Sequence, residues 1–239
     1  MLLHQTGPIT SSAQESACWH QQVEAGMAWV SVTAAEGRPP FDSLLQRVAN
    51  ARSAGFNVKP VIAGPLSVLW AISEGREAGL EQLDGLLDAY DDLLLALGQH
   101  GVEWVELDEP LLAQPLAPVW AAACERSYNR LQRTALKRLL AVSGGALVDN
   151  LGLACSLPVD ALQVELHDPE RELVAVLDRL PAYKALSLVL PESDLPSALV
   201  AQLVGVHQRL GQRLWLAASD VDQLAELAGQ LDNSSRIAA

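Results

Sequence analysis

Cysteine is scarce in this sequence, and its placement argues against a redox or disulfide role. The 239 residues contain three cysteines, Cys18, Cys124 and Cys155. They are odd in number and form no C-x-x-C pair, a pattern that fits a reducing compartment with buried or idle thiols. We therefore expect no disulfide framework and a cytoplasmic location.

Positive charge is also in short supply. Lys and Arg together number 16 against 29 Asp and Glu, which gives a formal net charge of -13 and a pI of about 4.7. The cations form no dense block, so nothing in the composition indicates a nucleic-acid-binding protein. The same excess of acid disfavours binding to an anionic membrane surface or a polyanionic ligand.

Long hydrophobic runs and targeting segments are missing as well. The uncharged stretches 60–73 and 110–124 are interrupted by proline and are too short to cross a bilayer. Residues 1–8 carry no basic region of the kind that begins a secretory signal. These features predict a soluble protein.

Several motifs that would identify a cofactor or nucleophile do not occur. No G-x-G-x-x-G follows a strand pattern, and there is no Walker loop and no G-x-S-x-G elbow. His4, His20, His100 and His207 have no His or Cys neighbour at ligand spacing. We therefore expect no zinc site within this chain.

What the chain does contain is a repeated alternation of strand and helix patterns. We expect strands at 26–33, 58–65, 102–107, 137–142, 161–166, 185–190 and 213–218, with residues 2–6 as an eighth. We expect helices at 41–54, 66–73, 80–99, 117–136, 147–157, 170–180, 195–210 and 221–232, and a polar break at 74–79. Strict alternation implies a parallel sheet.

Eight such units predict an α/β fold, the (β/α)8 or TIM-type barrel, with an atypical or truncated first βα unit. Half of the residues are hydrophobic, 50%, which is enough for one large core. We expect a single barrel domain at 26–232, preceded by a poorly readable segment at 1–25 and followed by a frayed tail at 233–239.

In a barrel of this kind the chemistry lies where the strands end. The polar residues at those positions are Thr33, Glu36, Ser67, Asp108, Glu109, Ser143, Glu165, His167, Asp168, Glu192, Ser219 and Asp220. This set is acidic and supplies one imidazole, no thiol and no cation.

Asp108 and Glu109 are the leading candidates, because they end a short strand just before Pro110. They could act as a general acid and base, or hold a substrate ammonium group. The alternative is that Asp108 binds loop backbone while Glu109 is solvated.

Two further motifs have a structural alternative. Glu165-x-His167-Asp168 could ligate a metal, but Asp168-Pro169 is also typical of a helix start, which we favour. Ser143-Gly-Gly145 could cradle an anion at a helix N-terminus, whereas a plain tight turn is the favoured interpretation.

Two stretches resemble a known family. Val58-Lys-Pro-Val-Ile-Ala-Gly-Pro-Leu-Ser-Val-Leu-Trp70 and Gly101-Val-Glu-Trp-Val-Glu-Leu-Asp-Glu-Pro-Leu-Leu112 are similar to cobalamin-independent methionine synthase. The stretches 157–165 and 213–219 make the chain more similar to the N-terminal of that family's two barrels. The resemblance covers roughly residues 26–222.

The resemblance also implies what this chain does not carry. The family holds its catalytic zinc on a His-x-Cys pair, a Glu and a distant Cys of the C-terminal barrel, and Ser143-Gly-Gly145 stands here instead of such a pair. No match to the family's basic folate-tail segment is found in residues 1–25. We expect a truncated homologue with no catalytic residues, no metal ligands, and neither zinc nor methyl-tetrahydrofolate as a resident cofactor.

The resemblance implies methyl transfer from 5-methyltetrahydropteroyltriglutamate to homocysteine, in methionine biosynthesis, with this chain inactive alone. Asp108, which matches the family's Asp-Glu-Pro motif, is carried over as a substrate contact together with Glu109, and Ser67 and Glu165 are further substrate-contact candidates because of their places at strand ends. One alternative is a non-catalytic subunit that docks on a separate zinc-bearing barrel. The other is an enzyme similar to uroporphyrinogen decarboxylase, which would need cations that the strand ends here do not supply.

Overall fold

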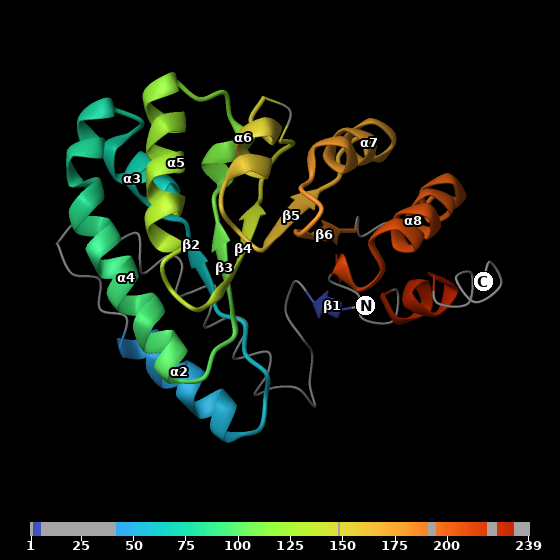
Figure 1. Ribbon diagram of the computed structural model, residues 1–239, viewed down its shortest axis with the longest axis horizontal. Coiled ribbons are helices and arrows are strands. Elements are labelled where there is room, and N and C mark those ends of the chain that lie inside the picture. Colours follow the sequence, from blue (N-terminus) through green and yellow to red (C-terminus); the bar gives the residue numbers. More distant parts are fainter. Residues whose placement is uncertain (1, 6–41, 148, 191–194, 219–223, 232–239) are drawn as a thin grey trace.

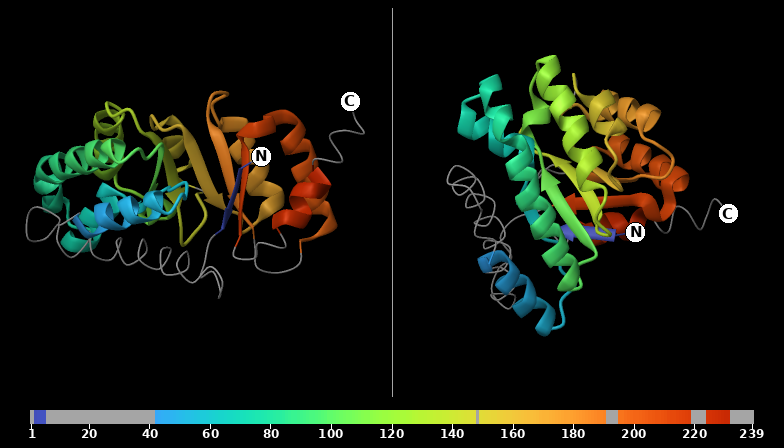
Figure 2. Two further views of the ribbon diagram at one scale, coloured as in Figure 1. Left: turned by 90° about the horizontal axis from the view of Figure 1, so that it is seen from below. Right: turned by 60° about the vertical axis from the view of Figure 1, so that its left-hand side comes forward.

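A computed structural model describes residues 2–5, 42–147, 149–190, 195–218 and 224–231. Its strands are β1 Leu2–Gln5, β2 Val61–Ala63, β3 Trp104–Asp108, β4 Lys137–Val142, β5 Ala161–Glu165, β6 Ala185–Val189 and β7 Leu214–Ala218. They form one parallel sheet in the order β1-β7-β6-β5-β4-β3-β2. Each strand after β2 therefore lies beside its neighbour in sequence, and β1 pairs with β7 (Figure 2).

The helices fill the connections between the strands. They are α2 Asp42–Ser53, α3 Pro65–Ser73, α4 Leu83–Gln99, α5 Pro118–Leu131, α6 Leu151–Ser156, α7 Pro169–Arg179 and α8 Ser197–Leu210, with 3-10 turns η2 Glu77–Gln82, η3 Pro110–Ala113 and η4 Gly211–Arg213. A further helix covers 224–231. Figure 1 shows α3, α4 and α5 gathered beside β2 and β3, while α7 and α8 cover the other end of the sheet.

This arrangement confirms the predicted fold class. Parallel strands in sequential order, with the first strand beside the last, are the topology of a (β/α)8 barrel. The predicted strand at 2–6 is present as β1. The predicted strand at 26–33, the segment 1–25 apart from β1, and the tail 233–239 lie outside the described residues, and no described strand joins β1 to β2.

Three predicted helices are too long, and the one expected at 147–157 is the short helix α6, which covers only Leu151–Ser156. The helix expected at 117–136 ends at Leu131, because residues 132–136 turn back toward β4 and Arg138 Nη1 donates to the Leu131 carbonyl at 2.7 Å. The helix expected at 80–99 begins at Leu83, since η2 occupies the preceding turn. That 3-10 turn also replaces part of the predicted break at 74–79. Short-range propensity did not reveal these ends, which tertiary contacts determine.

The apolar side chains form two layers, as the alternation of strand residues requires. The larger lies between sheet and helices and includes Val105, Leu107, Leu140 and Leu162, all with exposures of 0%. The smaller faces the other way and consists of Leu139, Ala161, Ala185 and Trp215, with Trp104 packed against it. Trp104 and Trp215 meet edge to face, their ring centroids 4.7 Å apart. This inner cluster fills the end of the barrel opposite the strand ends.

Within the described ranges, every helix is too short or too polar to cross a membrane.

Candidate functional site

Two of the described strand-end residues, Asp108 and Glu165, meet at the loop that follows β4. Asp108 ends β3 and is nearly buried, with 8% of its surface exposed. Its Oδ2 accepts the Ser143 hydroxyl at 2.7 Å, and its Oδ1 accepts the Ser143 backbone N–H at 3.2 Å. The interpretation that Asp108 binds loop backbone is therefore confirmed.

Glu165 reaches the same loop from β5. Its Oε2 accepts the Gly144 N–H at 3.3 Å and lies 3.8 Å from His167 Nε2. The predicted candidates Asp108 and Glu165 are thus brought together around one turn. Both carboxylates are occupied by donors of the protein itself.

The Ser143-Gly144-Gly145 segment is a turn, as favoured from the sequence. Gly144 has φ of 79°, a conformation that glycine adopts readily. The alternative, an anion cradle at a helix N-terminus, is wrong in its placement, because α6 begins only at Leu151. The carboxylates of Asp108 and Glu165 accept the N–H groups of residues 143 and 144.

Glu109 has a different role from the one the sequence suggested. It is fully buried, with 0% exposed, so the interpretation that it is solvated is wrong. Its carboxylate accepts the backbone N–H groups of Leu66 at 3.2 Å and Ser67 at 2.8 Å, and the Tyr128 hydroxyl at 3.3 Å. Glu109 therefore caps the N-terminus of α3, where the N-cap residue Gly64 has no side chain to do so.

Ser67 belongs to the same structural unit. Its Oγ accepts the Leu111 N–H at 3.1 Å, which ties α3 to the turn after β3. Gly64 is required at the corner, since an added Cβ would lie 2.0 Å from Glu109 Cδ. A substrate contact for Ser67 or Glu109 remains a prediction, and the observed contacts of both are structural.

The metal interpretation of Glu165, His167 and Asp168 gains no support. The described part of the chain contains no group of three or more His, Cys, Asp or Glu side chains placed to hold a metal ion. Asp168 is the N-cap residue of α7, as favoured, but its side chain makes no capping hydrogen bond. Glu172 Oε2 accepts the N–H of His167, the residue before the N-cap, at 2.7 Å and so ties the first turn of α7 to the preceding loop.

A polar layer inside the barrel was missed by reasoning that considered only the strand ends. Lys59 forms an ion pair with Glu106, and Gln163 Nε2 donates to Glu106 Oε1 at 3.4 Å. Ser187 Oγ in turn donates to Gln163 Oε1 at 2.9 Å. The signal was available, because Glu106, Gln163 and Ser187 are polar at alternate positions of otherwise apolar strands.

Burial and neighbouring charge shift the two central carboxyl groups. Burial raises the pKa of Asp108 to about 6, hydrogen bonds from Ser143 oppose this, and the charges of Glu106 and Glu165 add to it. Burial also raises the pKa of Glu109 to about 7, against the hydrogen bonds from Ser67, Leu66 and Tyr128. Asp108 is therefore able to exchange a proton slightly below neutral pH, at the edge of the polar layer.

We expect Asp108→Asn to change how stability depends on pH. A carboxyl whose pKa folding raises from 3.8 to about 6 binds its proton more tightly in the folded chain. Its stabilising contribution is complete below about pH 4 and is lost as the pH rises to about 6. The stability of Asp108→Asn relative to the unchanged chain should therefore rise by about 1–2 kcal/mol between pH 4.5 and 7, as measured by urea unfolding.

The matched variant is Ser143→Ala, which removes a donor that lowers the pKa of Asp108. It should extend the loss of stability to higher pH. If the free energy of unfolding depended on pH in the same way for all three proteins, this account of Asp108 would be contradicted.

The remaining candidates Thr33, Glu36, Glu192, Ser219 and Asp220 lie outside the described residues. The structure therefore describes the site only along β2 to β5.

The fold is similar to that of two solved structures. One is a methyltransferase from Methanosarcina mazei, with a TM-score of 0.55 and 15% identity over 82% of this chain and 65% of that one. The other is a B12-independent methionine synthase from Shewanella sp. W3-18-1 in complex with selenomethionine, with a TM-score of 0.53 and 11% identity over 81% of this chain and 66% of that one. The match thus spans slightly less than two thirds of each structure's length.

The sequence itself matches a family over most of its length. Residues 33–190 match the family described as "Cobalamin-independent synthase, N-terminal domain". The matched range contains Asp108, Glu109, Ser67 and Glu165, and it includes β2 to β6. The chain belongs to the family of the cobalamin-independent synthase N-terminal domain, as its two motifs predicted.

Proposed function

We propose that this chain is a non-catalytic barrel that completes a separate zinc-bearing methionine synthase barrel. The reaction served is methyl transfer from 5-methyltetrahydropteroyltriglutamate to homocysteine, in the cytoplasm. Thiol methylation needs an activated thiolate, which a bound zinc ion provides. In this proposal zinc and the methyl donor's reactive end belong to the partner's site.

The observation that carries the proposal is the internal use of the strand-end carboxylates. Asp108 is held by Ser143, Glu109 by the start of α3, and Glu165 by Gly144. Carboxylates that accept hydrogen bonds from the protein's own backbone and side chains hold the loops at the mouth of a barrel in place. A catalytic acid, by contrast, needs a carboxyl oxygen within hydrogen-bond reach of the substrate. The family membership and the fold support the choice of partner.

The test is reconstitution with a separately expressed C-terminal, zinc-bearing barrel of a B12-independent methionine synthase. We expect the two chains to co-elute and to form methionine at a rate that neither reaches alone. An unrelated (β/α)8 barrel of similar charge serves as the control partner. Methionine formation by this chain alone with one equivalent of zinc would overturn the non-catalytic assignment. Separate elution of the two chains, with no gain in the rate of methionine formation on mixing, would overturn the docking role.

In the same assay, the Asp108→Asn variant distinguishes a structural role of Asp108 from a catalytic one. If Asp108 only shapes the barrel mouth, the reconstituted rate at saturating homocysteine should be retained. A loss of the rate by about 100-fold or more, the scale of a lost acid–base group, would make Asp108 catalytic.

A further inference from the structure

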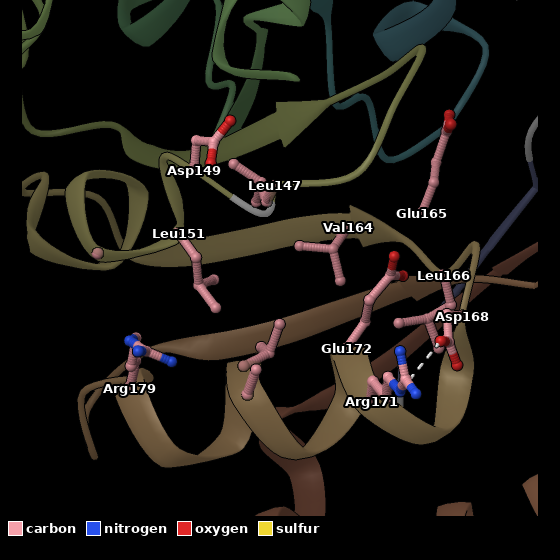
Figure 3. Close-up of a pocket in the computed structure, with 13 residues that line it drawn as sticks. Leu147, Asp149, Leu151, Val164, Glu165, Leu166, Asp168, Arg171, Glu172 and Arg179 are labelled. Atoms are coloured by element: carbon pink, nitrogen blue, oxygen red, sulfur yellow. Dashed lines mark ion pairs between the residues drawn. The ribbon is translucent and has the colours of Figure 1, made fainter. Parts of the chain in front are cut away.

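A hollow of about 600 Å³ lies between α6, α7 and the outer face of β5, and it adjoins the strand-end site at Glu165. Figure 3 shows Val164 of β5 on one side and α7 on the other, with Leu151 of α6 directed between them. The apolar lining consists of Leu147, Leu151, Val164, Leu166, Ala175 and Val176. Its size and lining are those of small-molecule sites, which usually pair an apolar floor with a few polar groups.

Most of the charged groups around this hollow are already engaged. Asp168 Oδ2 lies 3.7 Å from Arg171 Nε, the contact drawn in Figure 3. Glu172 accepts the His167 N–H, and Glu165 accepts the Gly144 N–H. These four side chains therefore offer little to a ligand.

Two lining residues of opposite charge are not engaged in this way. Asp149 and Arg179 are both exposed to solvent at the rim of the hollow, and neither forms a hydrogen bond or ion pair with another residue in the described ranges. Figure 3 shows them on opposite walls, Asp149 beside the start of α6 and Arg179 at the end of α7, with Leu151 between. Burial raises the pKa of the Cys155 thiol in α6, and the charges of Lys184 and Arg179 oppose this shift.

We propose that this pocket binds a free amino acid with an apolar side chain. Its carboxylate would pair with the Arg179 guanidinium, whose planar fork suits a carboxylate. Its ammonium group would pair with Asp149, and its side chain would cover Leu151, Val164 and Val176. A zwitterion can pair with both side chains at once, whereas a simple anion or amine can pair with only one of them. This inference does not rest on the proposed function.

Isothermal titration with L-leucine and L-phenylalanine tests the site, with isoamylamine and N-acetyl-L-leucine as probes that lack one charge. We expect both amino acids to bind at one equivalent, and each single-charge probe to bind at least about tenfold more weakly. Arg179→Gln and Asp149→Asn should each weaken L-leucine binding by a similar factor. Absence of binding at 10 mM amino acid, taken as about the weakest affinity worth assigning, would overturn the proposal. Equal binding of the amine alone would also overturn it.

Gly152→Phe distinguishes occupancy of the pocket from a general effect on the fold. Gly152 lines the hollow, and an added Cβ there meets no atom within 4 Å. The variant should therefore fold, fill the pocket and abolish L-leucine binding. The control is Gly205→Phe, at a position in α8 that is equally open and outside this lining. Unchanged binding by Gly152→Phe would place the amino acid elsewhere and overturn the assignment.

Discussion

Replacing Glu109 with alanine is expected to lower the free energy of unfolding by about 4 kcal/mol, among the largest effects of single substitutions. The variant leaves the N–H groups of Leu66 and Ser67 and the Tyr128 hydroxyl without their acceptor in a site that water does not reach. Each buried donor without a partner costs about 1–3 kcal/mol, and the lost side chain leaves a cavity. Urea unfolding followed by circular dichroism measures the change.

Two further variants make the Glu109 result specific. Glu109→Gln keeps the volume and one acceptor, so its loss should be intermediate. Glu103→Ala removes an exposed carboxylate whose partner is Lys137, and should cost less than about 1 kcal/mol. Equal losses for Glu103→Ala and Glu109→Ala would refute the capping role of Glu109.

Gly64→Ala is expected to cost about 3 kcal/mol, at the upper end of overpacking effects. The new Cβ would lie 2.0 Å from Cδ and 2.4 Å from Cγ of Glu109, which the hydrogen bonds to α3 hold in place. The cost comes from this contact, because Gly64 has φ of -71° and ψ of 149°, which alanine adopts without strain. Thermal and urea unfolding measure the loss.

The double variant Gly64→Ala with Glu109→Ala isolates the contact. With the Glu109 side chain gone, the alanine at 64 has room, so the two losses should be far from additive. Gly85→Ala in α4, where an added Cβ meets nothing within 4 Å, should be neutral or stabilising by up to about 1 kcal/mol. Additive losses would show that Gly64 is needed for another reason.

The regular elements could be read from the sequence because their patterns are local. The leucine spacing of α4 and the β-branched or apolar runs of β2 to β7 report, within a few residues, which face is buried. The Asp108-Glu109-Pro110 stretch likewise marks a strand end wherever the strand is placed. Fold class and family followed from these patterns, and both are confirmed.

The roles of the site residues could not be read in the same way. Glu109 meets Ser67 across 42 positions, Asp108 meets Ser143 across 35, and Gln163 meets Glu106 across 57. No local pattern encodes such distances, and a solvated and a buried carboxylate look alike in sequence.

The sequence by itself therefore determined a parallel strand–helix barrel, its family and the strand end that carries Asp108 and Glu109. Only the tertiary structure decided what those carboxylates do, because their partners come from segments far away in the sequence. Asp108 points to the barrel mouth and meets Ser143, whereas Glu109 turns to the start of α3 and is buried there. One residue step at the end of β3 thus separates a titratable group at the site from a structural cap.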